Sequence, residues 1–194
     1  MCLCSQSHMG RLVHGQRHPS TEPLSPEDEQ IVRDWILVAA PSDDPDLRRQ
    51  GRTIGTLFRF GMHPIVLGQA EAFNLKYIGA PRVLAWRRAK TYEPVRSPLR
   101  DEELPWLGEF VEYCHAHPCT SQNINRVVHA GGDRIGMPYL SARSLRHDTG
   151  ARALDKGGFN AAKALLATTD RITLGYGKRA DGRRALQELT DKGF

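Results

Sequence analysis

Two short stretches in the C-terminal half carry residue types that suit phosphodiester chemistry. The stretch "SARSLRHDTGARAL" places Arg143, Arg146 and His147 within five residues at an expected helix start, and "TLGYGKR" places Tyr176 further along. A tyrosine hydroxyl can attack a phosphate and conserve the bond energy in a covalent link. Arginine forks bind the charged non-bridging oxygens of the transition state, and a lysine or histidine protonates the leaving oxygen. Such a reaction requires no metal or cofactor.

The charge distribution favours a polyanionic partner. The net charge is +5, but residues 121–194 hold 13 Lys and Arg against 7 Asp and Glu, whereas the first 120 residues hold 14 against 15. The positive field therefore belongs to the C-terminal part, and nucleic acid is its natural partner. The alternative interpretation is a basic surface that only keeps the protein in solution, which gives the same charge distribution. No apolar run is long enough to span a bilayer, so we expect a cytoplasmic protein with no membrane partner.

Caps, apolar spacing and chain breakers predict a mostly α domain with a small antiparallel β-sheet, an α+β fold. Residues 1–23 are expected to be a flexible leader and residues 24–194 one domain. In the first expected helix, Ile31, Trp35 and Val38 form the apolar stripe. A β-hairpin is expected from Arg82–Lys90 and Pro94–Leu99. The expected helices cover about 25–39, 47–60, 65–75, 100–117, 121–131, 141–157, 159–169 and 181–194.

Glycines and serines mark the expected ends of the later helices. Ser121 is the expected cap of one helix, and the glycine pair at Gly131 its stop. Ser141 or Ser144 is the expected cap of the next helix, and Gly157–Gly158 its stop.

Four stretches of the sequence resemble the catalytic domain of the tyrosine recombinases, or phage integrases. "SLRHDTGARALDKGG" is similar to the family's second box, His-x-Leu-Arg-His-Thr followed by small and apolar residues and a glycine. "TLGYGKR" is similar to the Thr-x-x-Tyr pattern of its nucleophile. "WRRAKTYEPVRSPL" is similar to its lysine-bearing hairpin, and "SQNINRVVHAGGDRIGMPYLSARSLRH" to its helix before the second box. The resemblance covers about Leu24 to Lys178.

The resemblance implies a site-specific DNA recombinase of a mobile genetic element, which cleaves and rejoins strands through a 3′-phosphotyrosine. It implies Tyr176 as the nucleophile, Arg146 and Arg143 as phosphate ligands, and Lys90 as proton donor to the leaving 5′ oxygen. Its expected partners are double-stranded DNA and further copies of the chain assembled on that DNA, at the nucleoid. The expected DNA contacts are Arg59, Arg88, His147, Lys178, Arg179, Arg183 and Arg184.

The sequence departs from the family in its first box, which reads roughly Thr-Gly-Leu-Arg-x-x-Glu-Leu. The matching stretch "FGMHPIVL" puts His63 at the first catalytic arginine and Val66 at the glutamate. A histidine is cationic only part of the time near neutral pH and lacks the guanidinium fork. Arg59 lies four residues before His63 and could replace the missing cation from the same helical face.

Further departures lie elsewhere in the chain. Arg143 stands where the second box begins with histidine, and Ala167 or Thr168 stands where a histidine or tryptophan precedes the nucleophile. The segment from Arg146 to Tyr176 is slightly short. The family's N-terminal helical domain has no counterpart, which leaves three interpretations: a fragment, a truncated gene or a minimal single-domain member.

Alternatives therefore remain at the level of the protein and of single residues. The chain could be a decayed integrase that only binds DNA, or a scaffold that has lost DNA altogether. Arg146 could pair with Asp148 or Asp170, Lys90 could be an exposed strand lysine, and His147 could be a packed histidine. The cluster "CHAHPC", Cys114 to Cys119, has metal-ligand residue types but no standard zinc spacing, so a helix end with ordinary thiols competes with a zinc site.

Overall fold

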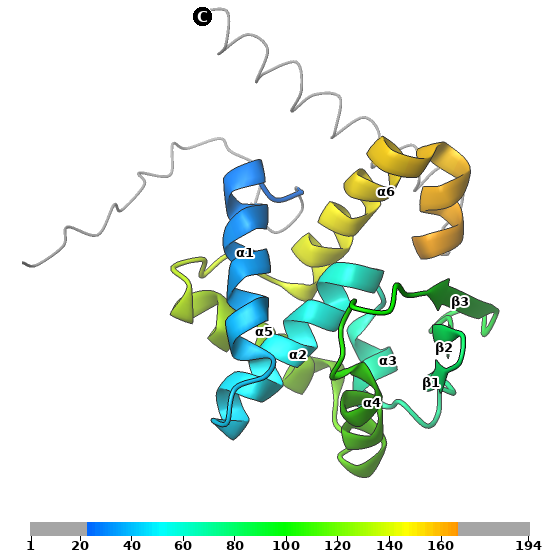
Figure 1. Ribbon diagram of the computed structural model, residues 1–194, viewed down its shortest axis with the longest axis horizontal. Helices are drawn as coiled ribbons and strands as arrows, with labels where there is room; N and C mark the ends of the chain where they lie inside the picture. Colours follow the sequence, from blue (N-terminus) through cyan, green and yellow to red (C-terminus); the bar gives the residue numbers. More distant parts are fainter. Residues whose placement is uncertain (1–22, 167–194) are drawn as a thin grey trace, which may run out of the picture.

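A computed structural model of the chain describes residues 23–166, which form a mostly helical body with a small antiparallel sheet at one side (Figure 1). The fold class expected from the sequence is confirmed at this level. The helices are α1 (Pro26–Ala39), α2 (Pro45–Phe60), α3 (Pro64–Gly68), α4 (Leu107–Ala116), α5 (Ser121–Arg134) and α6 (Ala142–Leu166). The strands are β1 (Lys76–Gly79), β2 (Arg82–Arg87) and β3 (Pro94–Pro98), in the order β1-β2-β3.

Helix α2 is the centre of the packing, because α1, α5 and α6 all lie against it. Asp44 caps its N-terminus by accepting from the backbone N–H groups of Asp46 and Leu47, and Pro45 occupies the first turn. From Thr53 to Phe58 every residue is buried, and Ile54 and Leu57 have no exposed surface. A helix enclosed in this way is held by tertiary packing rather than by its intrinsic propensity.

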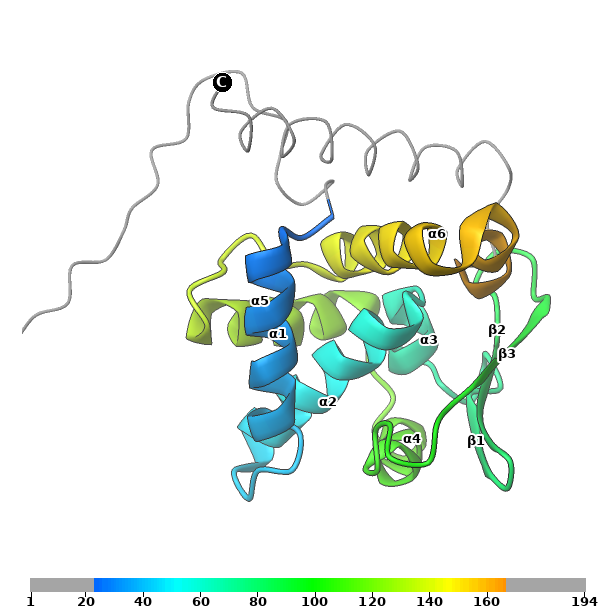
Figure 2. The same cartoon turned by 45° about the horizontal axis from the view of Figure 1, so that its top comes forward.

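Helix α6 packs against α2, and its far end turns back beside the sheet (Figure 2). Ser141 caps it as expected: its Oγ accepts from the N–H of Ser144, and the Ser144 Oγ accepts from the N–H of Ser141. The break comes at Gly158, whose φ of 74° and ψ of −173° are not helical. The glycine pair therefore kinks α6 at the predicted position.

The face of α1 that meets the core differs from the prediction. Ile31 and Val38 are exposed, and Val32, Ile36 and Ala39 are buried instead. The two sets lie one residue apart, so each forms a helical stripe and spacing alone does not choose between them. Trp35 is partly buried, against Gly131 of α5.

Gly131 and Gly132 do not stop α5, which continues to Arg134 and is capped by Thr120 rather than Ser121. A Cβ on Gly131 would lie 2.5 Å from Ile54 Cδ1, and one on Gly132 would lie 2.6 Å from the carbonyl oxygen of Met137. These glycines therefore allow close packing of α5 inside the body.

Helix α3 ends at Gly68 rather than near Leu75, and the chain then forms β1, which the sequence analysis did not predict. Asn74 has a φ of 49° and takes the chain out of the helical turns. β2 and β3 form the expected hairpin, with Trp86 opposite Val95. Helix α4 begins only at Leu107, because turns occupy the acidic stretch before it.

Candidate functional site

The candidate site begins where α2 ends. Gly61 adopts the left-handed conformation with a φ of 58°, and its N–H donates to the carbonyl oxygen of Leu57 at 2.8 Å. This turn brings His63 to the N-cap of α3, where its Nδ1 accepts from the N–H of Ile65 at 3.4 Å. The imidazole is thus held at the junction of two helices and is partly exposed.

The β2–β3 connection carries Lys90 and is anchored to the same end of α2. The ring of Trp86 in β2 packs edge-on against Phe60, the last residue of α2, with 5.8 Å between centroids. Phe73 stacks on Tyr92 within the connection, at 6.1 Å. These aromatic contacts hold the hairpin, while the Lys90 side chain itself is exposed.

Arg146 reaches this place from the second turn of α6. Its Nη1 donates to the carbonyl oxygen of Gly61, and its Nη2 donates to that of Leu166 at 2.8 Å. The alternative pairing with Asp148 is not among the ion pairs of residues 23–166, where that carboxylate accepts from Arg152 Nε at 2.7 Å. Asp170, the other alternative partner, lies outside the described residues.

His63, Lys90 and Arg146, which we call the cationic triad site, are close enough to influence one another. Partial burial lowers the pKa of His63 below its ordinary 6.5, and the positive charges of Arg146 and Lys90 lower it further. The neutral form of the His63 imidazole is therefore favoured. Three residues 27 and 56 positions apart thus converge from α6, the hairpin and the α2–α3 junction.

No carboxylate balances this charge within residues 23–166. None of the ion pairs there involves Arg146, Lys90 or His63. Cations placed together without carboxylates repel one another, and an anion bound among them would relieve that repulsion.

Arg143 and His147 extend the basic surface along α6. Arg143 is exposed, and its Nε donates to His147 Nε2 at 3.4 Å. Arg143 and His147 are four residues apart and therefore one helical turn apart, and Arg146 lies between them in the sequence. His147 is half-buried, so the structure gives it a packing contact as well as a place beside the site.

Arg59 and Arg88, both expected DNA contacts, are occupied by carboxylates of the chain. Arg59 pairs with Glu103, and Arg88 Nη1 lies 2.5 Å from Glu93 Oε2. Burial raises the pKa of Glu103, but the hydrogen bond and charge of Arg59 outweigh it and leave the pKa below its ordinary value. The expectation that Arg59 and His63 share a helical face is wrong, because α2 ends at Phe60.

The expected nucleophile and the C-terminal DNA contacts are not part of the described structure. Outside residues 23–166 lie Tyr176, Lys178, Arg179, Arg183 and Arg184, together with Ala167 and Thr168.

The Cys–His run at the end of α4 makes separate contacts. Cys114 is buried in the core. Its burial is the main cause that raises its pKa to about 12, and the nearby Cys119 adds to the rise. His115 Nε2–H donates to the carbonyl oxygen of Leu75 at 2.6 Å, and His117 stacks on Tyr113 at 4.3 Å. In the described part of the chain, no three metal-ligating side chains come together. These contacts favour the helix-end interpretation over the zinc site.

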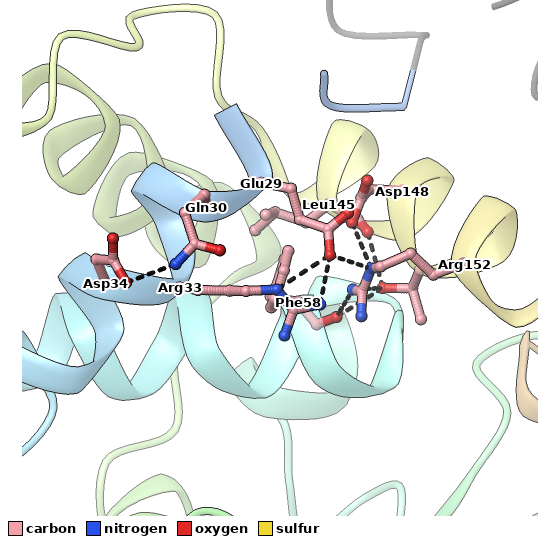
Figure 3. A network of polar contacts seen from close by, with 9 residues as sticks. Glu29, Gln30, Arg33, Asp34, Phe58, Leu145, Asp148 and Arg152 are labelled. Carbon is pink, nitrogen blue, oxygen red and sulfur yellow. Dashed lines mark hydrogen bonds and ion pairs between the residues drawn. The ribbon is translucent and has the colours of Figure 1, made fainter. Parts of the chain in front are cut away.

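Sequence reasoning missed a polar network on the other flank of α6 (Figure 3). Arg152 binds Asp148, lies 3.8 Å from Glu29 Oε1 and donates to the carbonyl oxygen of Phe58, which also accepts from Thr149. The spacing of Asp148 and Arg152, four residues apart in a helix, was a visible signal for their pairing. Their link to α1 and α2 had no signal in the sequence.

Comparison with known proteins adds no relative: no protein-family model matches the chain, and no curated protein matches it. Between residues 23 and 166, no helix combines the length and apolar character needed to span a bilayer.

Proposed function

We propose that the protein is a DNA strand-cleaving and rejoining enzyme of the tyrosine recombinase type. Tyr176 attacks a backbone phosphate and forms a 3′-phosphotyrosine. Arg146 and Arg143 bind the non-bridging oxygens, and Lys90 protonates the leaving 5′ oxygen. The bond energy stays in the phosphotyrosine, so a 5′ hydroxyl can rejoin the strand without a metal or cofactor.

The observation that supports this proposal is the cationic triad site. Three residues named from the resemblance come together from distant parts of the chain, and two of them, Arg146 and Lys90, bring positive charge without a carboxylate. A phosphate in the transition state carries extra negative charge on its oxygens, which such a site stabilises. Arg146 uses two of its donors on carbonyl oxygens, and the guanidinium has five in all.

One observation favours a second candidate, a DNA-binding protein that no longer cuts. Because burial and the neighbouring charges of Arg146 and Lys90 lower the pKa of His63, the position of the family's first arginine favours a neutral imidazole over a permanent positive charge. Loss of one donor to a developing negative charge typically lowers the rate about 10²- to 10³-fold. The phosphate would still be bound by Arg146 and Lys90.

Covalent trapping separates the two candidates. The full chain is incubated with nicked duplexes drawn from the DNA beside its own gene, and the products are run on denaturing gels. Wild type, Tyr176→Phe and His63→Arg are compared side by side. We expect a slow-migrating adduct with wild type, more of it with His63→Arg, and none with Tyr176→Phe.

The other results of the trapping assay distinguish between the remaining candidate functions. An adduct formed only by His63→Arg means a lapsed enzyme whose scaffold still positions the tyrosine. Salt-sensitive DNA binding without an adduct in any lane overturns the enzymatic proposal in favour of the DNA-binding protein. Binding that is absent, or independent of salt, favours a scaffold that has lost DNA, because phosphate contacts weaken steeply as salt rises.

A further inference from the structure

The last turn of α2 ends in carbonyl groups that α-helical geometry leaves without partners. An α-helix offers no N–H groups to its final four carbonyls, so other donors must satisfy them. Two side chains of α6 reach the carbonyl oxygen of Phe58: Thr149 Oγ donates at 2.8 Å, and Arg152 Nη2 donates as well. Arg146 Nη1 binds the carbonyl oxygen of Gly61, three residues further. Helix α6 therefore caps the end of α2 at two points.

The cap at Phe58 is buried and held on several sides. Thr149 is 2% exposed and Asp148, which accepts from Arg152 Nε, is 1% exposed. The guanidinium of Arg152 lies over the ring of Phe58, with 4.0 Å from Cζ to the centroid. Buried polar groups with all partners in place have one well-defined arrangement, because any displacement leaves a charge unpaired.

Helix α1 contributes two further side chains to the network around Phe58 and Arg152. Glu29 Oε1 accepts from Arg33 Nε at 3.0 Å and lies 3.8 Å from Arg152 Nε. Arg33 also lies over the Phe58 ring, at 5.0 Å from the centroid, so two guanidinium groups face that ring (Figure 3). Among these residues, Arg152 alone links α1, α2 and α6 by polar contacts.

We propose that Arg152 is a positioning residue, which sets the end of α2 against α6 and thereby places His63 beside Arg146. His63 follows Phe58 by five residues, and only the Gly61 turn lies between the cap and the imidazole. Displacement of the α2 end would break the bond between Arg146 and the carbonyl oxygen of Gly61 and move His63 away from Arg146. Within the proposed function, on which this role rests, the effect would be on the geometry of the phosphate site.

The titration of His63 reports this placement without any DNA. The charged groups that face it are Arg146 from α6 and Lys90 from the hairpin, and both lower its pKa together with partial burial. If the α2 end moves away from α6, these influences weaken and the pKa rises towards that of an exposed histidine, about 6.5. NMR of the full chain measures the midpoint, with the His63 signal assigned among the eight histidines by a His63→Gln variant.

Three variants separate positioning from charge and from folding. Arg152→Lys keeps the positive charge but loses the two-armed reach to Asp148 and Phe58. Arg152→Met with Asp148→Leu removes one charge of each sign, so the field at His63 changes little and no buried charge is left alone. Arg33→Met is the matched control, because Arg33 also stacks on Phe58 and pairs with Glu29 but binds no carbonyl of α2.

We expect the His63 midpoint to rise in Arg152→Lys and in the double variant, and to stay at the wild-type value in Arg33→Met. A wild-type midpoint in the double variant with an unchanged melting temperature overturns the proposal. So does an equal rise in Arg33→Met, because any loosening of the network would then suffice. A failed covalent-trapping assay leaves these outcomes intact, so failure of the positioning role and failure of the proposed function are distinguishable.

Discussion

Arg146 and Arg152 lie six residues apart on α6 and meet opposite electrostatic surroundings. Arg152 has Asp148 at 2.7 Å and Glu29 at 3.8 Å, and its charge is balanced inside the protein. Arg146 has two backbone carbonyl oxygens and lies near Lys90 and His63, with no carboxylate paired to it in residues 23–166. The charge of Arg152 is therefore balanced by carboxylates of the chain, and that of Arg146 is not balanced within residues 23–166.

The difference shows how one helix can serve two purposes with the same residue type. A balanced arginine contributes to the folded state whether or not a ligand is present. An unbalanced arginine beside other cations gains most when an anion arrives, because the repulsion is then relieved. Substitutions at the two positions should accordingly move different measured quantities.

The largest effect on stability is expected from Asp148→Ala. This change leaves the guanidinium of Arg152 without its buried carboxylate, and breaking a buried pair in this way costs about 3–5 kcal/mol. Urea denaturation measures the free energy of unfolding. Arg152→Met combined with Asp148→Leu should recover most of that loss, since no charge then stays unpaired. A loss below about 1 kcal/mol in Asp148→Ala would contradict the balanced network.

The largest effect on DNA binding is expected from Arg146→Met. Hydrogen bonds to charged groups contribute roughly 1.5–3 kcal/mol, so the affinity for duplex DNA should fall about 10- to 150-fold. Because the proposed contact is to phosphate, the loss should be similar for unrelated sequences, and the salt dependence should become less steep by about one unit. Fluorescence anisotropy across a salt series measures both. Arg33→Met, on the balanced flank, is the control and should bind as wild type.

A smaller effect is expected from pH at His63. A histidine whose pKa is lowered by folding takes up its proton more readily in the unfolded chain. Its contribution to stability is therefore largest above pH 6.5, and it declines as the pH falls through the unfolded and then the folded pKa. Unfolding measured from pH 8 to pH 5 should show a shallower decline in His63→Gln than in wild type. Identical pH profiles would show that His63 is not held in a cationic environment.

The smallest effect is expected from the pair of Arg59 and Glu103. Both side chains are 29% exposed, and solvent screening limits such pairs to about 1 kcal/mol or less. Glu103→Gln should lower the free energy of unfolding by no more than this. It should also free Arg59 for phosphate if that arginine lies on the DNA-facing surface, which would raise DNA affinity slightly. Unchanged affinity would place Arg59 away from the bound DNA.

Much of the secondary structure could be predicted, because local signals specify it. Ser25, Asp44 and Ser141 cap their helices through their own side chains, and Gly158 breaks α6 where a non-helical conformation is needed. The prediction was wrong where a local signal had two explanations. Gly131 has the character of a helix stop but serves close packing against Ile54, which depends on a residue 77 positions away.

Three residues of the candidate site could be named from the sequence, but their surroundings could not. Arg146, Lys90 and His63 were named from residue types and from the resemblance, while Tyr176 lies outside the described residues and stays a prediction. That Arg59 pairs with Glu103, and that Arg146 binds Gly61 and Leu166, could not be foreseen. These contacts join segments 20 to 85 residues apart, and their formation depends on how the helices pack.

The sequence by itself determined the class of fold, the caps of α1 and α6, the kink in α6 and the excess of positive charge in its C-terminal part, because these follow from neighbouring residues and from composition. Only the tertiary structure decided which face of α1 is buried, which arginines are balanced by carboxylates, and that burial and the charges of Arg146 and Lys90 lower the pKa of His63. The physical reason is that burial and charge–charge interaction depend on distance in space. A sequence specifies that distance only through the packing of the whole chain.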